Sequence, residues 1–206
     1  MTDVLKEIAI LVTAYLLGSI PFGYLLVKWV KGVDVRTQGS GNIGMTNVWR
    51  VAGAKWGILT LVLDIAKGAL AVAIARYFDP NDSQTLVLTG VVALLGNIFS
   101  VFLNFKGGKG IGISVGVFFS LLPMESTAGL IVFLIALAIG RMISVGSLLG
   151  VTTMAVFTLY EYLQHGLDYW YLGLALFAAV MIWWTHRQNI QRILKGTENK
   201  IGKKKA

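Results

Sequence analysis

The feature that most constrains this chain is a stretch of 20 residues without a charged side chain, residues 8–27. A helix rises about 1.5 Å per residue, so a helix of this length crosses the roughly 30 Å hydrocarbon core of a bilayer. A cleaved signal peptide is disfavoured, because the acidic Asp3 and Glu7 precede the stretch and no small-residue cleavage site follows it. We therefore expect a membrane-spanning helix near the start of the chain.

Six further apolar stretches follow, and none alternates between apolar and polar residues as the strands of a membrane barrel do. Because only helices and closed barrels satisfy the backbone in lipid, we expect helices throughout. A composition of 56% hydrophobic and 14% charged residues excludes an ordinary soluble domain. The sequence thus predicts an all-α polytopic membrane protein with about seven transmembrane helices in a single domain, residues 1–206. The six stretches are residues 56–75, 85–105, 111–122, 127–139, 147–160 and 169–184, with a tight turn expected at Pro123 between the two short ones.

Positively charged residues predict how the chain is oriented. Placing the N-terminus outside leaves fifteen lysines and arginines in the inside segments and only Lys6 and Arg76 outside. This asymmetry follows the positive-inside rule, so we expect a cytoplasmic C-terminus whose lysines 203–205 are attracted to anionic lipid headgroups. Topology accounts for the net charge of +8, and no nucleic-acid partner is expected. The inside segments are residues 28–55, 106–110, 140–147 and 185–206.

The first inside segment is rich in glycine and in hydrogen-bond donors. Glycines let a backbone approach a ligand closely, and exposed N–H groups in such a segment can form an anion-binding nest. An arginine adds a bidentate fork for phosphate oxygens. Taken alone, the segment could equally be a flexible loop with a topology-setting arginine. Its candidate phosphate-binding residues are Ser40, Gly41, Asn42, Thr46, Asn47 and Arg50.

The other three inside segments also carry donors suited to phosphate, whereas the outside segments do not. The second is not a P-loop, because Ile111 stands where that motif requires a Gly-Lys-Ser/Thr sequence. In the last one, His186 and Asn189 are three residues apart and share a helix face, although His186 could also be an ordinary interfacial residue. A single anion site at the cytoplasmic surface explains this asymmetry best. The candidates are Lys106, Gly107, Gly108, Lys109, Arg141, Ser144, Ser147, His186, Asn189 and Glu198.

Two further observations limit the chemistry. The chain has no cysteine, which excludes disulfides, thiol nucleophiles and cysteine-ligated metals. Asp64 and Lys67 lie three residues apart in the second apolar stretch, where charges are costly unless paired. We expect them to neutralise one another in a structural role, with a share in the anion site as the alternative.

Taken together, the polar segments resemble a known family, the bacterial membrane acyl-phosphate:glycerol-3-phosphate acyltransferases. The resemblance extends over nearly the whole chain, and its motifs fall in order on the predicted inside face. One departure is Asn97, which follows Gly96 where the family usually has histidine. The matching segments are residues 18–23, 39–44 with Thr46 and Asn47, 63–68, 105–110, Arg141 with Ser144 and Ser147, and 186–192 with Gly196 and Glu198.

The resemblance implies a seven-helix bundle in the bacterial inner membrane with its active site open to the cytoplasm. The implied reaction moves a fatty acyl group from acyl phosphate to the sn-1 hydroxyl of glycerol 3-phosphate, without metal or cofactor. The resemblance also suggests a soluble enzyme that makes acyl phosphate as a partner. The implied catalytic residues are Ser40, Lys109, His186 and Asn189.

An acyl phosphate is already activated, so such an enzyme needs mainly positioning and electrostatic stabilisation. The proton of the glycerol hydroxyl could go to His186 or to the donor's own phosphate. We favour the donor phosphate, with His186 and Asn189 orienting glycerol 3-phosphate. A small organic-anion transporter and a membrane scaffold are the alternatives from other functional classes.

Overall fold

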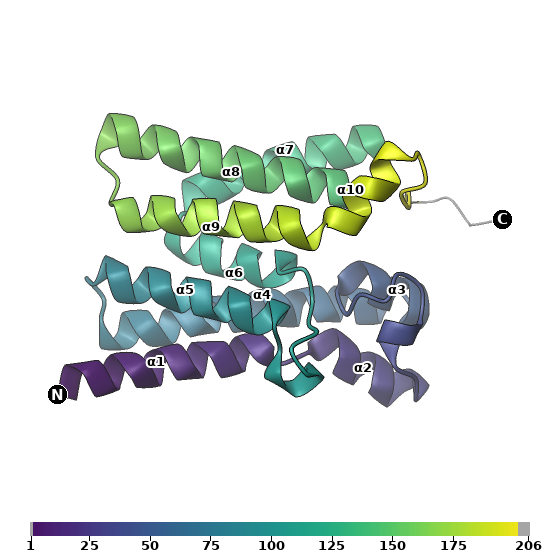
Figure 1. The fold of residues 1–206 in the computed structure, drawn as a ribbon, viewed down its shortest axis with the longest axis horizontal. Coiled ribbons are helices and arrows are strands. Elements are labelled where there is room, and N and C mark those ends of the chain that lie inside the picture. Colours follow the sequence, from purple (N-terminus) through teal and green to yellow (C-terminus); the bar gives the residue numbers. More distant parts are fainter. Residues whose placement is uncertain (1, 202–206) are drawn as a thin grey trace. The chain divides into compact units, whose positions relative to one another are not determined.

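The computed structural model describes residues 2–201, and within them the chain is helical without strands (Figure 1). The all-α fold class expected from the sequence is confirmed. Lysines 203–205, for which attraction to lipid headgroups was expected, lie outside the described residues.

The chain divides into two compact units, Met1–Leu121 and Leu122–Ala206, and each is described by itself. In the first unit α1 packs against α5, and α4 packs against α3 and α6. In the second unit α8 packs against both α7 and α9. The first unit contains α1 (Thr2–Ser19), α2 (Phe22–Lys31), the 3₁₀ turn η1 (Val35–Thr37), α3 (Met45–Ala52), α4 (Ala54–Phe78), α5 (Ser83–Ile98), the 3₁₀ turn η2 (Val101–Leu103) and α6 (Ile111–Leu121). The second contains α7 (Pro123–Gly140), α8 (Ile143–His165), α9 (Tyr169–Thr185) and α10 (Arg187–Leu194).

Five helical segments among the described residues are long and apolar enough to cross a membrane. Two shorter apolar helices, Ile111–Leu121 and Tyr169–Thr185, coincide with two further stretches expected from the sequence. Leu122 is the one residue between α6 and α7, and Pro123 occupies the first turn of α7, where its missing N–H costs nothing. The break expected between the two short stretches is therefore present, at Leu122 and not at Pro123. The five long segments are Asp3–Lys31, Ala54–Phe78, Ser83–Leu103, Pro123–Gly140 and Ile143–His165.

The first of these segments is interrupted, so the expectation of one continuous helix over residues 8–27 is wrong. Helix α1 ends at Ser19 and α2 begins at Phe22, because Pro21 has no N–H and its ring clashes with a continuing helix. Two carbonyls at the break are satisfied by side chains from elsewhere in the unit. The Ser100 hydroxyl donates to Ser19 O at 2.5 Å, and Lys67 Nζ donates to Ile20 O at 2.8 Å.

Helices α4 and α6 approach each other closely enough that side chains would not fit at the crossing. A Cβ atom on Gly116 would lie 2.0 Å from Ile65 O, and one on Gly68 would lie 2.4 Å from Ile113 O. Small residues that bring backbones together are typical of helix packing in membranes. This close contact fixes the position of α6, whose N-terminus follows the second glycine-rich segment discussed below.

Candidate active site

In the first unit, Asn47 at the start of α3 organises residues 38–44, which we call the first glycine loop. Asn47 is 1% exposed. Its side-chain oxygen accepts a hydrogen bond from Ser40 N at 2.8 Å, and its amide nitrogen donates to the carbonyls of Val35, Gln38 and Asn42 at 2.9–3.1 Å. The Asn47 side chain therefore holds the loop in shape from within.

The backbone of the first glycine loop requires glycine at two positions. Gly39 and Gly41 have φ angles of 58° and 72°, in the left-handed region that other residues rarely adopt. A Cβ atom on Gly39 would also lie 2.3 Å from the Asn47 side-chain oxygen. The loop's shape thus depends on glycine and Asn47 together.

An ion pair anchors the start of this loop. Arg36 binds Asp34 through both Nε and Nη2, at 2.7–3.1 Å, and its guanidinium lies 5.2 Å from the Tyr24 ring centre. The hydrogen bonds from Arg36 hold the pKa of Asp34 below its usual value. Around this frame Ser40, Gly41 and Arg50 are exposed, while Asn42 and Thr46 are half-buried.

The second glycine loop, residues 104–110, is bonded to the end of α5 through its backbone. Gly107 N donates to Ile98 O and Gly108 N donates to Asn97 O, both at 2.9 Å. A Cβ atom on Gly107 would lie 2.1 Å from Asn97 O, so only glycine allows this approach. These two glycine N–H groups serve the fold and not a ligand. In this loop Lys106 is exposed and Lys109 is half-buried.

The two glycine loops lie against each other within the first unit. A Cβ atom on Gly108 would lie 3.4 Å from Ile43 Cγ1, and Ile43 O packs against Gly23 of α2 so closely that a Cβ there would lie 1.8 Å away. The structure thus brings the predicted residues of the first two inside segments, 40–50 and 106–109, to one end of this unit. Lysine, arginine and hydroxyl groups concentrated there could bind a phosphate.

In the second unit, Glu198 joins the start of α8, helix α10 and the segment after it. Its Oε1 accepts from the Ser144 hydroxyl at 2.9 Å and from Asn189 Nδ2 at 2.6 Å, and its Oε2 accepts from Arg192 Nε at 2.8 Å. Burial alone would raise the pKa of Glu198, but the hydrogen bonds from Arg192, Asn189 and Ser144 outweigh it and hold the pKa below its usual value. Glu198 is therefore an ionised organiser of the cluster.

The backbone holds the same segments together. Ile201 N donates to Arg141 O at 2.8 Å, and Arg141 ends α7 in the left-handed conformation, with φ of 56°. The Arg141 side chain is exposed, whereas Ser144 and Ser147 are each 5% exposed. The Ser147 hydroxyl donates back to Ile143 O at 3.0 Å within α8.

His186 lies at the junction of α9 and α10 and is 4% exposed. Its Nδ1 lies 2.8 Å from Ile182 O, which can only accept a hydrogen bond. We infer that Nδ1 carries a proton and donates it to this carbonyl. Asn189 follows one turn later, as the three-residue spacing predicted, and is 7% exposed. The two residues can orient a polar ligand.

Comparison with known proteins accords with this geometry. A family model described as glycerol-3-phosphate acyltransferase matches residues 8–196. The glycerol-3-phosphate acyltransferase of Myxococcus xanthus is 44% identical over 194 residues, which cover 94% of this chain and 98% of that protein. The chain belongs to the glycerol-3-phosphate acyltransferase family.

Two crystal structures place this acyltransferase within the PlsY type of the family. They show PlsY, an integral membrane glycerol 3-phosphate acyltransferase, in a glycerol 3-phosphate form and in a lysophosphatidic acid form. Their TM-scores to this chain are 0.88 and 0.86, at 36% identity and with 96% of each chain covered. The acyltransferase is therefore a multi-pass membrane protein.

Arg192, a member of the cluster around Glu198, was not among the candidate residues selected from the sequence. Arg192 binds Glu198 at 2.8 Å and so holds the carboxylate that contacts Ser144 and Asn189. A signal was present, because His186, Asn189 and Arg192 recur every three residues and so share one face of a short helix. Within residues 2–201, no three His, Asp or Glu side chains gather as a metal site would require.

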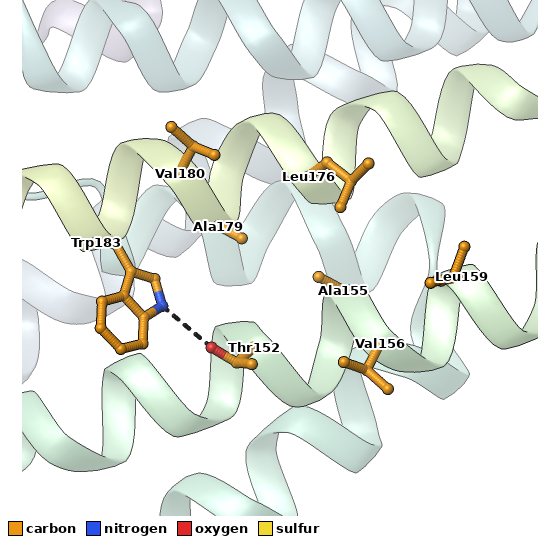
Figure 2. A pocket seen from close by; sticks show the side chains of 8 residues that line it. All are labelled: Thr152, Ala155, Val156, Leu159, Leu176, Ala179, Val180 and Trp183. Carbon is orange, nitrogen blue, oxygen red and sulfur yellow. Dashed lines mark hydrogen bonds between the residues drawn. The ribbon is translucent and has the colours of Figure 1, made fainter.

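The acyltransferase also has an apolar groove between α8 and α9 (Figure 2). Its volume is about 490 Å³. At one end of the groove, Trp183 Nε1 donates to the Thr152 hydroxyl at 3.1 Å. Trp183 lies three residues before His186 in the sequence. The rest of the lining is suited to hydrocarbon chains. The groove is lined by Thr152, Ala155, Val156, Leu159, Leu176, Ala179, Val180 and Trp183.

Proposed function

We propose that this acyltransferase moves a fatty acyl group from acyl phosphate to the sn-1 hydroxyl of glycerol 3-phosphate, as the first acylation step of phospholipid synthesis. The likeness to PlsY in its glycerol 3-phosphate form, over 96% of the chain, carries this proposal. Polar clusters suited to phosphate, one in each unit, support it.

The reaction needs no covalent enzyme intermediate. The sn-1 hydroxyl oxygen attacks the carbonyl carbon of the acyl phosphate, and the bond from that carbon to the bridging phosphate oxygen breaks. The products are 1-acyl-glycerol 3-phosphate, which is lysophosphatidic acid, and inorganic phosphate. Both substrates are anionic, so the chain's main task is to hold negative charges together and to stabilise the charge that develops on the carbonyl oxygen.

In the first unit, we assign phosphate contacts to Lys106 and Lys109, to Arg50, and to the hydroxyls and exposed backbone around Ser40. Of these residues, we assign Lys109 and Ser40 a catalytic role, in contact with the reacting groups of the acyl phosphate. We assign Asn47 and Gly107 to positioning instead, because their donors bind backbone carbonyls within the unit. Asn42, Thr46, Gly41 and Gly108 shape the surface that would face the ligand.

In the second unit, His186 and Asn189 orient glycerol 3-phosphate, and Arg141 supplies positive charge. Ser144 and Ser147 line the start of α8 beside them. Glu198 acts as a positioning residue, since an ionised carboxylate repels phosphate and this one accepts hydrogen bonds from three side chains of the protein.

For the proton of the attacking hydroxyl, we favour transfer to the donor's own phosphate as that phosphate leaves. The leaving phosphate gains negative charge when its bond to the acyl carbon breaks, so it becomes a stronger base at the moment the proton is released. His186 would then contribute a hydrogen bond through Nε2 and not general-base catalysis.

We further propose that the chain crosses the bacterial inner membrane seven times, with its N-terminus outside and its active site in the cytoplasm. The shorter helices α6 and α9 would be the two additional spans. The charge asymmetry of fifteen cations inside to two outside supports this orientation. Cytoplasmic exposure would give a soluble acyl-phosphate-forming enzyme access to the site.

The test is to incubate the purified chain with acyl phosphate and glycerol 3-phosphate and to measure lysophosphatidic acid and phosphate in equal amounts. Lys109→Ala should lower turnover by ~10²-fold or more, as loss of a positioned electrostatic donor does. Lys28→Ala is the control, because this exposed lysine donates its hydrogen bond to Gly32 O, at 3.2 Å, within α2's own C-terminal turn. An organic-anion transporter would move glycerol 3-phosphate into vesicles without forming product, and that result would refute the proposal.

A further inference from the structure

The buried ion pair of Asp64 and Lys67 has no part in the proposed chemistry, yet it contacts elements that lead into both glycine loops. Lys67 Nζ lies 2.8 Å from Asp64 Oδ1, near the middle of α4, and the two side chains are 2% and 14% exposed. The expected pairing is confirmed. The contacts that surround the pair say more about its role.

Lys67 reaches the break between α1 and α2. Its Nζ donates to Ile20 O at 2.8 Å and lies 5.6 Å from the centre of the Phe22 ring. Helix α2 starts at Phe22, and its second residue, Gly23, packs directly on Ile43 O of the first glycine loop. Lys67 therefore fixes the point from which α2 leads toward that loop.

Asp64 lies against the start of α6. A Cβ atom on Gly112 would lie 2.7 Å from Asp64 Cβ and 3.4 Å from Asp64 Oδ2, so the acid packs on the backbone of the first turn. A carboxylate is favourable beside the N-terminus of a helix. Gly112 comes two residues after Gly110, the last residue of the second glycine loop. Asp64 therefore fixes the far end of that loop.

We propose that Asp64 and Lys67 are positioning residues that set the placement of the two glycine loops relative to each other. The inference rests on the proposed function in so far as those loops hold the substrates. Stability is a poor explanation for the pair, because replacing a buried ion pair by apolar residues of similar volume is often neutral or stabilising. What the pair adds is directional contact with two elements: Lys67 donates to Ile20 O, and Asp64 packs on the first turn of α6.

The test removes both charges at once, in the double variant Asp64→Leu/Lys67→Met. We expect it to fold with a thermal midpoint within a few degrees of the parent's, because loss of the ion pair itself is often neutral, whereas loss of the Lys67 donor to Ile20 O costs one hydrogen bond. We expect kcat per folded molecule to fall ~10- to 100-fold, as small misplacements of bound reactants do, with a smaller change in KM for glycerol 3-phosphate. The single variant Lys67→Arg keeps the positive charge and the hydrogen-bond donors beside Asp64, so it should retain most of the parent's kcat.

A second readout does not depend on activity. The chain has no cysteine, so Gln38→Cys introduces an exposed spin-label site at the start of the first glycine loop, and Phe102→Cys introduces one just before the second. The distance distribution between the labels should shift or broaden in the double variant. In the single variant Lys67→Arg it should match that of the parent chain. If the parent chain shows no acyl transfer, the proposed function fails, and the label distances still decide the positioning role.

The control is an ion pair of the same length in the same unit. Lys6 Nζ lies 2.8 Å from Asp79 Oδ1, joining α1 to the end of α4 away from the loops. Lys6→Met/Asp79→Leu should leave kcat and the label distance unchanged. The proposal is overturned if the Asp64/Lys67 double variant keeps its kcat and label distance, or if the control pair shows equal losses. Should the double variant not fold, Asp64→Asn is measured instead, and an unchanged distance there overturns the proposal.

Discussion

At the scale of single residues, His186 is where the proposed mechanism is most open to experiment. The contact of Nδ1 with Ile182 O, at 2.8 Å, fixes the orientation of its ring. If it only orients glycerol 3-phosphate, His186→Ala should lose affinity for that substrate and keep some turnover. His186→Asn or His186→Gln should regain part of the loss through a hydrogen bond. Separate kcat and KM measurements check this. Complete inactivity of all three variants with unchanged binding would show that His186 is the general base.

Glu198 predicts a pH dependence with a definite sign. Its pKa in the folded chain lies below its usual value, so its contribution to stability is complete above the unfolded pKa of about 4.3. That contribution is lost as the pH falls through the lower, folded pKa. The thermal midpoint of Glu198→Gln should therefore lie below that of the parent at pH 7, and the gap should shrink on acidification. A gap that widens toward low pH would contradict this account.

Sequence analysis at this scale found the polar residues but could not divide ligand contacts from internal supports. Asn47 and Glu198 were both selected as phosphate-binding residues, and both belong to hydrogen-bond networks inside the protein. An asparagine that bonds a ligand and one that bonds three backbone carbonyls are identical in the sequence. The difference arises only when the loop folds around the side chain.

At the scale of elements, the second glycine loop depends on its contact with the end of α5. Gly107→Ala would place a methyl group 2.1 Å from Asn97 O. We expect it to destabilise the chain by about 1–3 kcal/mol, as overpacking does, and to lower turnover at least ~10-fold by moving Lys106 and Lys109. Thermal unfolding and initial rates measure both effects.

The matched control is Gly173→Ala on α9, where an added Cβ meets nothing within 4 Å. This change should be neutral or stabilising by up to about 1 kcal/mol, because alanine favours helix over glycine. If Gly107→Ala matched Gly173→Ala in stability and in initial rate, the close contact between the second glycine loop and α5 would not be needed for activity.

Hydropathy predicted where the long helices lie, but it predicted neither the break in the first one nor the short helix α3 within the first inside segment. Apolar stretches that show no strand-like alternation predict helices in a membrane, and six of the seven stretches each contain one α-helix, although the third stretch also extends through η2. The first stretch divides at Pro21 because proline removes a helical hydrogen bond. Proline alone was ambiguous, since membrane helices also continue through proline with a kink. The side chains that satisfy the freed carbonyls are Lys67 and Ser100, far along the sequence.

At the scale of the whole molecule, the charge asymmetry predicts which parts face which side of the membrane. Single cysteines can test this cleanly, because the chain has none of its own. Asn81→Cys, between α4 and α5, should react with a membrane-impermeant maleimide added to intact cells. Gln38→Cys and Lys195→Cys should react only after the membrane is opened. Labelling of Gln38→Cys in intact cells would show that the orientation is the opposite one, with the glycine loops outside.

The interruption of the first span also bears on how the chain is made. The carbonyls of Ile20 and Ser19 obtain their side-chain partners from residues 47 and 81 positions later, Lys67 and Ser100. When α1 and α2 leave the ribosome, neither partner has been synthesised. Until then the Ser19 carbonyl lacks its Ser100 donor, and the Ile20 carbonyl has the local bond from Phe22 N at 3.2 Å without the one from Lys67. Poorly paired carbonyls in lipid are unfavourable, so this first segment should stay loosely inserted, or shielded by the insertion machinery. The earliest helices to be translated thus reach their final form only after about half of the 206 residues exist.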